Sequence, residues 1–181
     1  MRGWIVLLIW VSCLTNVYAD SIDWSHPDVD RLRTAINSRI NQFRLSNKLT
    51  TLEDDSILDL AAQNQANYCR STQRVRHDQP KAQLADTRKR VQFYGGQYRT
   101  LGENAGSFTV GRKAVFRWDT GDTTVIIDTY EKAAEWFFHL WRLSPVHRSN
   151  LLYPNLNRSG LGFAYDPTNQ VFYAVHVLGR I

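Results

Sequence analysis

The stretch WRLSPVHRSNLL, residues 141–152, decides how this chain of 181 residues is interpreted. It closes a run of large apolar side chains that begins at Trp136, which predicts a helix buried on most sides. Because proline cannot continue a helix, we expect that helix to end before Pro145 and Ser144 to cap the turn that follows. His147 would then lie directly after a buried helix, where a polar side chain can contribute to a site.

Apolar spacing upstream predicts three further helices, and capping residues mark their starts. The first begins at Ser25-His26-Pro27-Asp28, with Ser25 as the N-cap. The second runs from Asp54 or Asp55 to about Arg70, and the third covers Leu84 to Phe93 and ends before Gly95-Gly96. Strand signals come later, in two hairpins. These are 114–118 with 123–127, and 161–165 with 171–178. Helices followed by strands predict an α+β fold.

Residues 1–19 have the form of an export signal, in which a short apolar run, 4–14, precedes small residues ending at Ala19. We expect cleavage after Ala19 and a single mature domain, 20–181, that is secreted or periplasmic and has no transmembrane segment. The alternative, a lipoprotein signal ending at Cys13, has a poor match in the residues before that cysteine. Export without an internal disulfide suggests a bacterial envelope or secreted protein.

The positive charge is concentrated in one segment. The whole chain carries 22 basic and 17 acidic residues, a formal charge of +5. Residues 70–99 hold eight of the basic residues and only two acids, so the rest of the mature chain is slightly negative. The segment could line the positive rim of a cleft suited to anionic groups, or Arg88, Lys89 and Arg90 could form a solvated helix face pointing outward.

Three polar clusters stand out, and each has a structural alternative. His77 follows the second predicted helix, and a loop histidine is most often simply exposed. Gly102-Glu103-Asn104-Ala105-Gly106 could be a turn with an Asn/Gly cap. The run 144–152 could be no more than a connection between helices. Each cluster taken alone is a weak signal.

Taken together, the order and spacing of these motifs resemble the CAP superfamily (cysteine-rich secretory proteins, antigen five and pathogenesis-related proteins) in its short bacterial, SCP-like form. The resemblance covers roughly residues 29–179. The matching positions are Asn37, Arg44, Leu52, Leu58, Ala61-Ala62, Ala66, His77, Gly102-Glu103-Asn104, 141–152, Gly160-Leu161-Gly162-Phe163-Ala164-Tyr165 and the strand Phe172 to Gly179.

The resemblance implies an α-β-α sandwich, with a small antiparallel sheet between helices and a cleft lined by two histidines and two acids. His77, Glu103 and His147 match three of those four positions. Ser144 stands where eukaryotic members have the fourth acid, and Glu135 is a weak substitute. The expected ligand cleft therefore comprises His77, Glu103, Asn104, Ser144 and His147.

Two imidazoles and a carboxylate are a suitable ligand set for Zn²⁺ or a similar divalent ion, so His77, His147 and Glu103 are candidate metal ligands. The leading hypothesis is a non-enzymatic, monomeric binding module for a metal or for an apolar or cell-envelope, lipid-like ligand. The alternative is a metal-dependent, peptidase-like hydrolase that uses the same three residues as catalytic candidates. A serine protease is not favoured, because the sequence lacks the G-x-S-x-G nucleophile elbow. No nucleic-acid partner is expected, because no binding motif accompanies the basic segment.

The remaining notable residues have structural explanations. His176 is expected in the core or at the cleft edge, His139 and His26 in a helix and a cap, and Cys69 in the core. The segment 110–127 is expected to be a hairpin insertion that borders the cleft and adjusts ligand choice.

Overall fold

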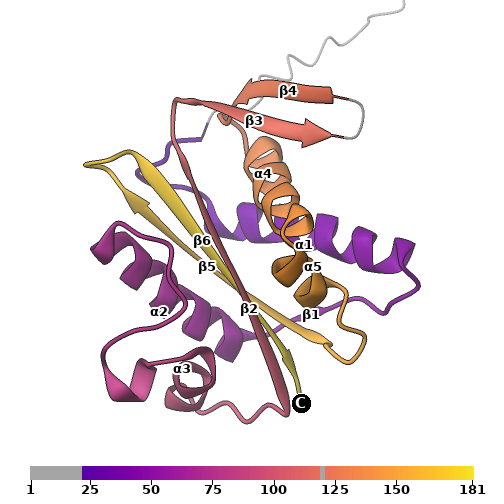
Figure 1. The fold of residues 1–181 in the computed structure, drawn as a ribbon. Coiled ribbons are helices and arrows are strands. Elements are labelled where there is room, and N and C mark those ends of the chain that lie inside the picture. Colours follow the sequence, from indigo (N-terminus) through magenta and orange to yellow (C-terminus); the bar gives the residue numbers. More distant parts are fainter. Residues whose placement is uncertain (1–21, 119–120) are drawn as a thin grey trace, which may run out of the picture.

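A four-stranded sheet separates two layers of helices (Figure 1). The computed structural model describes residues 22–118 and 121–181. The predicted signal segment 1–19, its cleavage after Ala19 and the alternative lipid attachment at Cys13 lie outside these residues. Among the helices of the described ranges, none combines the length and the apolar character needed to cross a membrane. The α+β class and the sandwich architecture are as expected.

The sheet has the strand order β1-β5-β6-β2 and is mixed rather than purely antiparallel, because the short β1 pairs in parallel with β5. Its strands are β1 (Glu53–Asp54), β5 (Arg158–Asp166), β6 (Val171–Arg180) and β2 (Thr100–Thr109). The predicted hairpin at 161–178 is confirmed as β5 and β6. The Gly-Glu-Asn motif lies inside the edge strand β2, so its interpretation as a turn is wrong.

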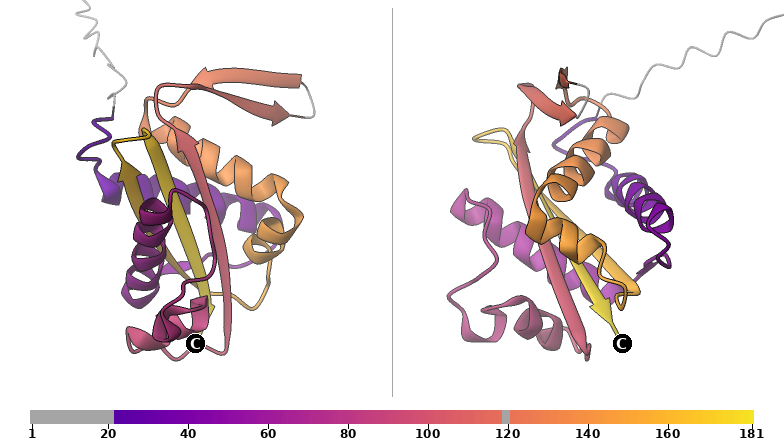
Figure 2. Two further views of the ribbon diagram at one scale, coloured as in Figure 1. Left: turned by 60° about the vertical axis from the view of Figure 1, so that its left-hand side comes forward. Right: turned by 45° about the vertical axis from the view of Figure 1, so that its right-hand side comes forward.

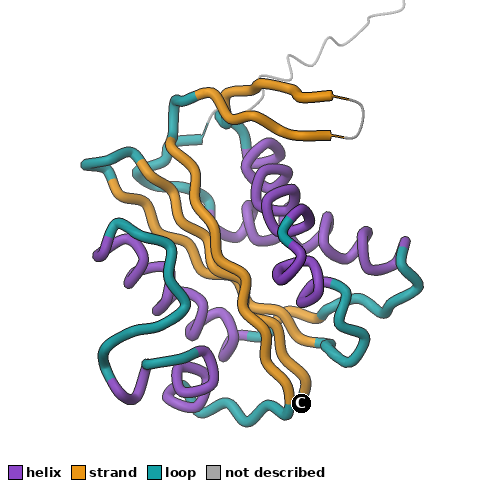
Figure 3. Tube along the Cα trace, in the orientation of Figure 1, coloured by secondary structure: helices purple, strands orange, loops and turns teal. Residues whose placement is uncertain are grey.

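Helices cover both faces of the sheet, as Figures 2 and 3 show from several sides. One layer contains α2 and α3, and the other contains α1, α4 and α5. Their bounds are α1 (Val29–Ser46), α2 (Ser56–Thr72), α3 (Thr87–Phe93), α4 (Tyr130–Leu143) and α5 (Pro145–Leu151), with a 3₁₀ turn η1 (Ala82–Leu84) before α3.

Two helix starts differ from the predictions. The side chain of Asp28, not that of Ser25, caps α1 by accepting from the Arg31 amide, while Ser25 hydrogen-bonds Asp23. The predicted helix 84–93 is split, since Asp86 caps α3 after η1 has ended. In both cases an aspartate three residues before a free amide is the better acceptor, because its carboxylate carries a full negative charge at the helix N-terminus.

The layer of α1 and α4 packs on the sheet through aromatic rings. Phe108 of β2, Phe137 and Trp141 of α4 and Phe172 of β6 are all buried. Phe137 lies between its neighbours, with ring centroids 5.5 Å from Phe108 and 5.7 Å from Trp141. The prediction that the tryptophan-rich helix is buried is confirmed.

The layer of α2 instead brings backbone against backbone. Ala61, Ala62 and Ala66 face the sheet and are fully buried. A Cβ atom added at Gly162 would lie 2.2 Å from the backbone nitrogen of Gln63, so only glycine fits at this contact. Small side chains on both elements therefore set the close approach of α2 to β5.

Cys69 belongs to the same helix and confirms its prediction as a core residue. It is a buried free thiol, and its sulfur accepts a hydrogen bond from the Arg76 amide at 3.4 Å. Burial raises the pKa of the Cys69 thiol, which disfavours the reactive thiolate.

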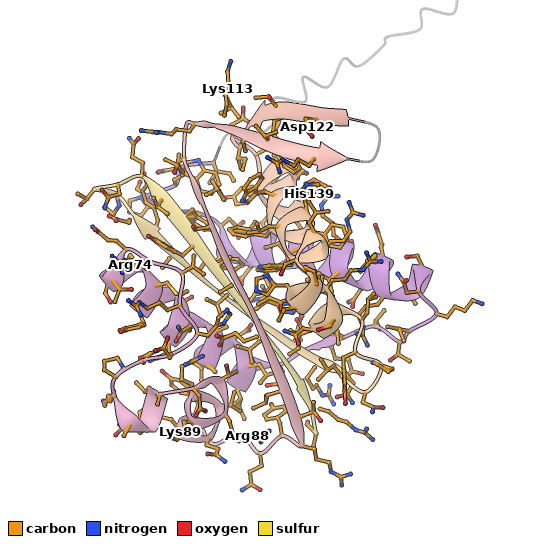
Figure 4. The ribbon with its side chains drawn as sticks, viewed as in Figure 1. Arg74, Arg88, Lys89, Lys113, Asp122 and His139 are labelled. Atoms are coloured by element: carbon orange, nitrogen blue, oxygen red, sulfur yellow. The ribbon has the colours of Figure 1, made fainter. Side chains whose placement is uncertain are left out.

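The predicted hairpin is confirmed as β3 (Lys113–Trp118) paired with β4 (Gly121–Ile126), which lies beside the start of α4 in Figure 1. Its Phe116 ring contacts Trp136 and His139 of α4, at centroid distances of 5.3 and 5.2 Å. His139 is labelled in Figure 4. The hairpin begins beyond Thr109, about 20 Å along β2 from Glu103 at 3.3 Å per residue. It therefore packs on α4, which corrects the expectation that this segment borders the site.

Candidate functional site

The edge strand β2 connects the two helical layers through a pair of adjacent polar residues. Successive side chains of a strand point to opposite faces. Accordingly, Glu103 hydrogen-bonds His77 and Arg90 on the side of α2 and α3, whereas Asn104 bonds the backbone of His147 on the side of α5. The motif thus contacts two histidines that are distant in sequence: His77 is 26 positions before Glu103, and His147 is 43 positions after Asn104.

Glu103 is buried, and both of its carboxylate oxygens are occupied. Oε1 lies 2.8 Å from His77 Nδ1, and Oε2 accepts from Arg90 Nη2. Because an ionised carboxylate can only accept, Nδ1 of His77 carries the proton and Nε2 is the ring nitrogen left for other partners. Glu103 therefore orients the imidazole.

Arg90 is the site residue that the sequence did not indicate. Its side chain is fully buried and donates to the carbonyl oxygens of His77 and Leu84, both at 3.1 Å, and to Thr87 Oγ1 at 3.2 Å. The prediction that these three side chains point outward is correct for Arg88 and Lys89, which are exposed, and wrong for Arg90, which is buried. A run of three basic residues gives no signal for which of them points inward, since the partner carboxylate is distant in sequence.

On the other side of β2, hydrogen bonds fix α5 to the strand. Asn104 Nδ2 donates to the His147 carbonyl at 3.2 Å, while Asn150 Nδ2 donates to the Glu103 carbonyl at 3.2 Å and to Asn104 Oδ1 at 2.9 Å. Ser144 Oγ caps α5 by accepting from the His147 amide at 3.5 Å. The predicted capping role of Ser144 is confirmed, and Asn150 is a positioning residue that the sequence analysis gave no role of its own.

The two predicted histidines lie close together, with ring centroids 6.1 Å apart and ring planes inclined by 57°. The hydrogen bond that His77 donates to Glu103 raises the pKa of His77, whose side chain is half exposed. Burial lowers the pKa of His147, and the charge on His77 lowers it further. His147 Nδ1 is buried and has no hydrogen-bond partner among the described residues. Of the two histidines, His147 is therefore the one that loses its proton at the lower pH.

The described residues contain no group of three or more His, Cys, Asp or Glu side chains that could hold a metal ion. The predicted ligand set of His77, Glu103 and His147 is not assembled, because the two carboxylate oxygens of Glu103 accept hydrogen bonds from His77 and Arg90. Two imidazoles, those of His77 and His147, remain as neighbouring side chains with ring nitrogens. A histidine that binds a metal through one nitrogen commonly donates its other N–H to a carboxylate, as His77 does to Glu103.

Glu135 does not supply the fourth acid of the site. Its Oε2 lies 2.5 Å from Arg39 Nη1, so it joins α4 to α1 in the opposite layer from Glu103. Ser144 occupies the family position of that acid and serves as a helix cap.

His176 is confirmed as a core residue. It is fully buried, stacks on Trp141 at a centroid distance of 5.5 Å and has Nε2 2.8 Å from Ser159 Oγ. His139 is also buried, and its Nε2 accepts from the Arg117 amide at 3.1 Å, while His26 is exposed beside Asp23. These three histidines have structural explanations.

A sheet between two helical layers, with two histidines and a buried glutamate at its edge strand, defines the class of α-β-α sandwich that the motifs suggested. The chain belongs to the cysteine-rich secretory protein (CAP) family, whose model matches residues 38–178. The comparison with curated proteins found no match.

Solved bacterial structures have the same fold. An outer surface protein from Borrelia burgdorferi superposes with a TM-score of 0.64 at 17% identity, over 84% of this chain and 95% of that one. An extracellular SCP-domain protein from Bacillus anthracis superposes with a TM-score of 0.61 at 20% identity, and a cysteine-rich secretory protein from Staphylococcus aureus with a TM-score of 0.54 at 18% identity. Each of these two matches covers 84% of this chain. This chain spans 41% and 39% of the lengths of those last two.

Proposed function

We propose that this chain is an exported binding domain that holds its ligand at His77 and His147 and carries out no chemical turnover. The observation that carries the proposal is the state of Glu103, whose two oxygens are engaged by His77 and Arg90. A general base must also come within hydrogen-bond reach of the proton that it abstracts. The Glu103 side chain is only 4% exposed, so a substrate has little access to it, and its position instead orients the His77 imidazole.

The ring nitrogens define the binding groups. In the proposed site, a divalent ion such as Zn²⁺ is held by Nε2 of His77 and by a ring nitrogen of His147. When bound, such an ion supplies a Lewis-acidic contact for an oxygen of the ligand. Each imidazole must be neutral to bind a metal, so binding is expected to weaken as the pH falls.

Exposed apolar side chains beside His147 favour an amphipathic, cell-envelope ligand over a purely polar one. Val146 is 70% exposed and Leu143 is 51% exposed, just before the histidine in sequence. Both side chains are therefore accessible to the apolar part of a ligand that reaches His147. We propose that they receive the apolar part of the ligand, while the two imidazoles, or an ion that they hold, receive its polar group.

Export is the second part of the proposal. It is supported by the signal-like segment 1–19 and by the bacterial neighbours, which are described as extracellular and outer surface proteins. The hydrolase alternative is disfavoured, because its candidate base Glu103 is buried between His77 and Arg90.

The proposal is tested by titrating the purified protein with Zn²⁺ in a calorimeter. His77→Ala and His147→Ala should each weaken binding at least about tenfold, because each removes one of two ligands. His26→Ala, which removes an exposed histidine, should leave binding unchanged. Equal binding by all three variants would contradict the assignment of the site.

The absence of turnover is tested separately with casein and peptidoglycan as substrates. Wild-type protein and Glu103→Gln should both give only background hydrolysis. The binding-only proposal fails if the wild type hydrolyses either substrate and if His77→Ala, His147→Ala and Glu103→Gln abolish that activity while remaining folded.

A further inference from the structure

A cavity of about 620 Å³ is bounded by α3, the loop 94–99, the start of β2 and Ile181, and none of His77, Glu103 and His147 lines it. Its volume is within the range of small-molecule sites, roughly 300–1,000 Å³. Arg88 marks it in Figure 4, near the foot of β2. Arg88 is exposed, whereas Arg90, two positions later on the same helix, is buried against Glu103. The cavity is therefore separate from the histidine site.

The charged side chains that line this cavity are both cations, Arg88 and Arg99. Ile181, the last residue of the sequence, lines it as well. Arg88 donates to the carbonyl oxygens of Tyr98 at 2.9 Å and Arg99 at 3.4 Å, which holds its guanidinium beside the loop 94–99. Within residues 22–118 and 121–181, no ion pair joins either guanidinium to an acidic side chain. The pair therefore offers positive side-chain charge to a ligand.

The remaining wall has both polar and apolar parts. Gln92 and Gln97 supply amide groups, and Val91 and Leu101 supply apolar surface. Tyr98 is anchored by its hydroxyl, which donates to Asp55 Oδ2 at 2.6 Å. Because Tyr98 and Arg88 are already held by hydrogen bonds, a ligand has to order fewer side chains when it binds.

We propose that this cavity binds a phosphate ester, with Arg88 and Arg99 contacting the phosphate and the amide and apolar groups contacting the alcohol part. Guanidinium groups bind phosphate oxygens through charge-assisted and often bidentate hydrogen bonds. A phosphate ester has the composition that the walls require, since it joins an anion to a neutral organic group. The inference goes beyond the metal and ligand site at His77 and assigns a role to Arg88 and Arg99, two exposed arginines of the basic segment 70–99 that the histidine site does not use.

The test is calorimetric titration with glycerol 3-phosphate at about 150 mM salt, where long-range attraction between exposed charges is screened. The double variant Arg88→Gln/Arg99→Gln should bind at least about tenfold more weakly than wild type. The matched control, Arg74→Gln/Lys89→Gln, removes the same charge from the same basic segment but outside the cavity, and should change binding by less than about twofold.

Two further variants keep the result interpretable. Arg99→Gln removes a side chain that makes no hydrogen bond within the described fold, so its weaker binding cannot be a folding defect. His77→Ala should bind glycerol 3-phosphate normally, which separates this proposal from the proposed function. Failure of the wild type to bind, or an equal loss in both double variants, would overturn the phosphate site.

A second arm distinguishes the source of the phosphate. Sedimentation with phosphatidylglycerol vesicles, against phosphatidylcholine vesicles as the neutral control, measures binding to a lipid headgroup. Binding to phosphatidylglycerol that is lost in Arg88→Gln/Arg99→Gln and kept in Arg74→Gln/Lys89→Gln identifies a headgroup site. Binding of glycerol 3-phosphate alone identifies a soluble ester. Vesicle binding that is lost equally in both double variants indicates general charge attraction and contradicts the proposal.

Discussion

The two faces of the sheet are packed by opposite means. On the α2 face, glycines of β5 lie under alanines of the helix and backbone meets backbone, whereas on the α4 face large aromatic rings fill the space. A backbone contact cannot move to admit another atom, but a side chain can rotate. The α2 face therefore fixes the position of the loop that carries His77, and the site is formed where β2 joins this layer to the more adaptable one.

The largest effect is expected from adding one carbon to the rigid face. Gly162→Ala would place a Cβ 2.2 Å from the Gln63 nitrogen and 2.3 Å from the Ala62 carbonyl carbon. We expect this variant to lose about 3 kcal/mol or more of unfolding free energy, because the helix must move. Chemical denaturation followed by circular dichroism measures the loss.

The matched substitution on the aromatic face is Gly106→Ala. Its Cβ would meet the end of the Leu140 side chain at 2.5 Å, and that side chain can rotate away. The expected cost is about 1 kcal/mol. Equal costs for Gly106→Ala and Gly162→Ala would show that the two faces do not differ in the proposed way.

The next effect concerns the buried His176 of the aromatic face. Burial lowers the pKa of His176 to about 3. Below pH 6.5, His176 binds a proton in the unfolded chain but not in the folded protein. The free energy of unfolding should therefore fall as the pH decreases from 6.5 towards 3. The slope contributed by this group approaches about 1.4 kcal/mol per pH unit.

Denaturation curves between pH 7 and 5 measure this slope before most carboxylates titrate. His176→Gln keeps a polar group near Ser159 and removes the titrating ring. The variant should be less stable at pH 7 and should show a flatter pH dependence. An unchanged slope in the variant would show that His176 is not the group responsible.

A smaller effect is expected where the two layers are joined. Asn150→Ala removes the hydrogen bonds to the Glu103 carbonyl and to Asn104 Oδ1, and should cost roughly 1–2 kcal/mol. The substitution should also shift the NMR signals of His147, because α5 loses two of its hydrogen bonds to β2. Asn67→Ala, at an exposed position on α2, should change neither property.

The smallest effect on stability is that of His77. Its folded pKa is raised, so its contribution to stability is complete below pH 6.5 and is lost as the pH rises through the folded value. Because the side chain is half exposed, the contribution should be below about 1 kcal/mol. NMR titration should place the midpoint of His77 above 6.5 and that of His147 below it, and Glu103→Gln should lower the His77 midpoint.

The helices were predictable because their signals are local. Asp55 caps α2, apolar residues recur on one face, and Pro145 separates α4 from α5. The strand β2 was not predictable in the same way. Gly102 and Gly106 weaken its strand pattern, and both lie against side chains that are distant in sequence, since a Cβ at these positions would meet Asn150 and Leu140.

The site was predictable in part. His77, Glu103 and His147 were found through motif order, and the structure brings them together. The orienting role of Glu103 was not found, because it depends on Arg90, which nothing in the sequence distinguishes from Arg88 or Lys89. Which arginine is buried is a property of the packed fold.

The most direct test of the central claim is the response of the histidine NMR signals to Zn²⁺ at pH 7.5. The account predicts that the ring signals of His77 and His147 shift or broaden together at low metal concentration, while those of His176 and His26 remain in place. A response from only one of the pair, or an equal response from His26, would contradict the assignment of His77 and His147 as one binding site.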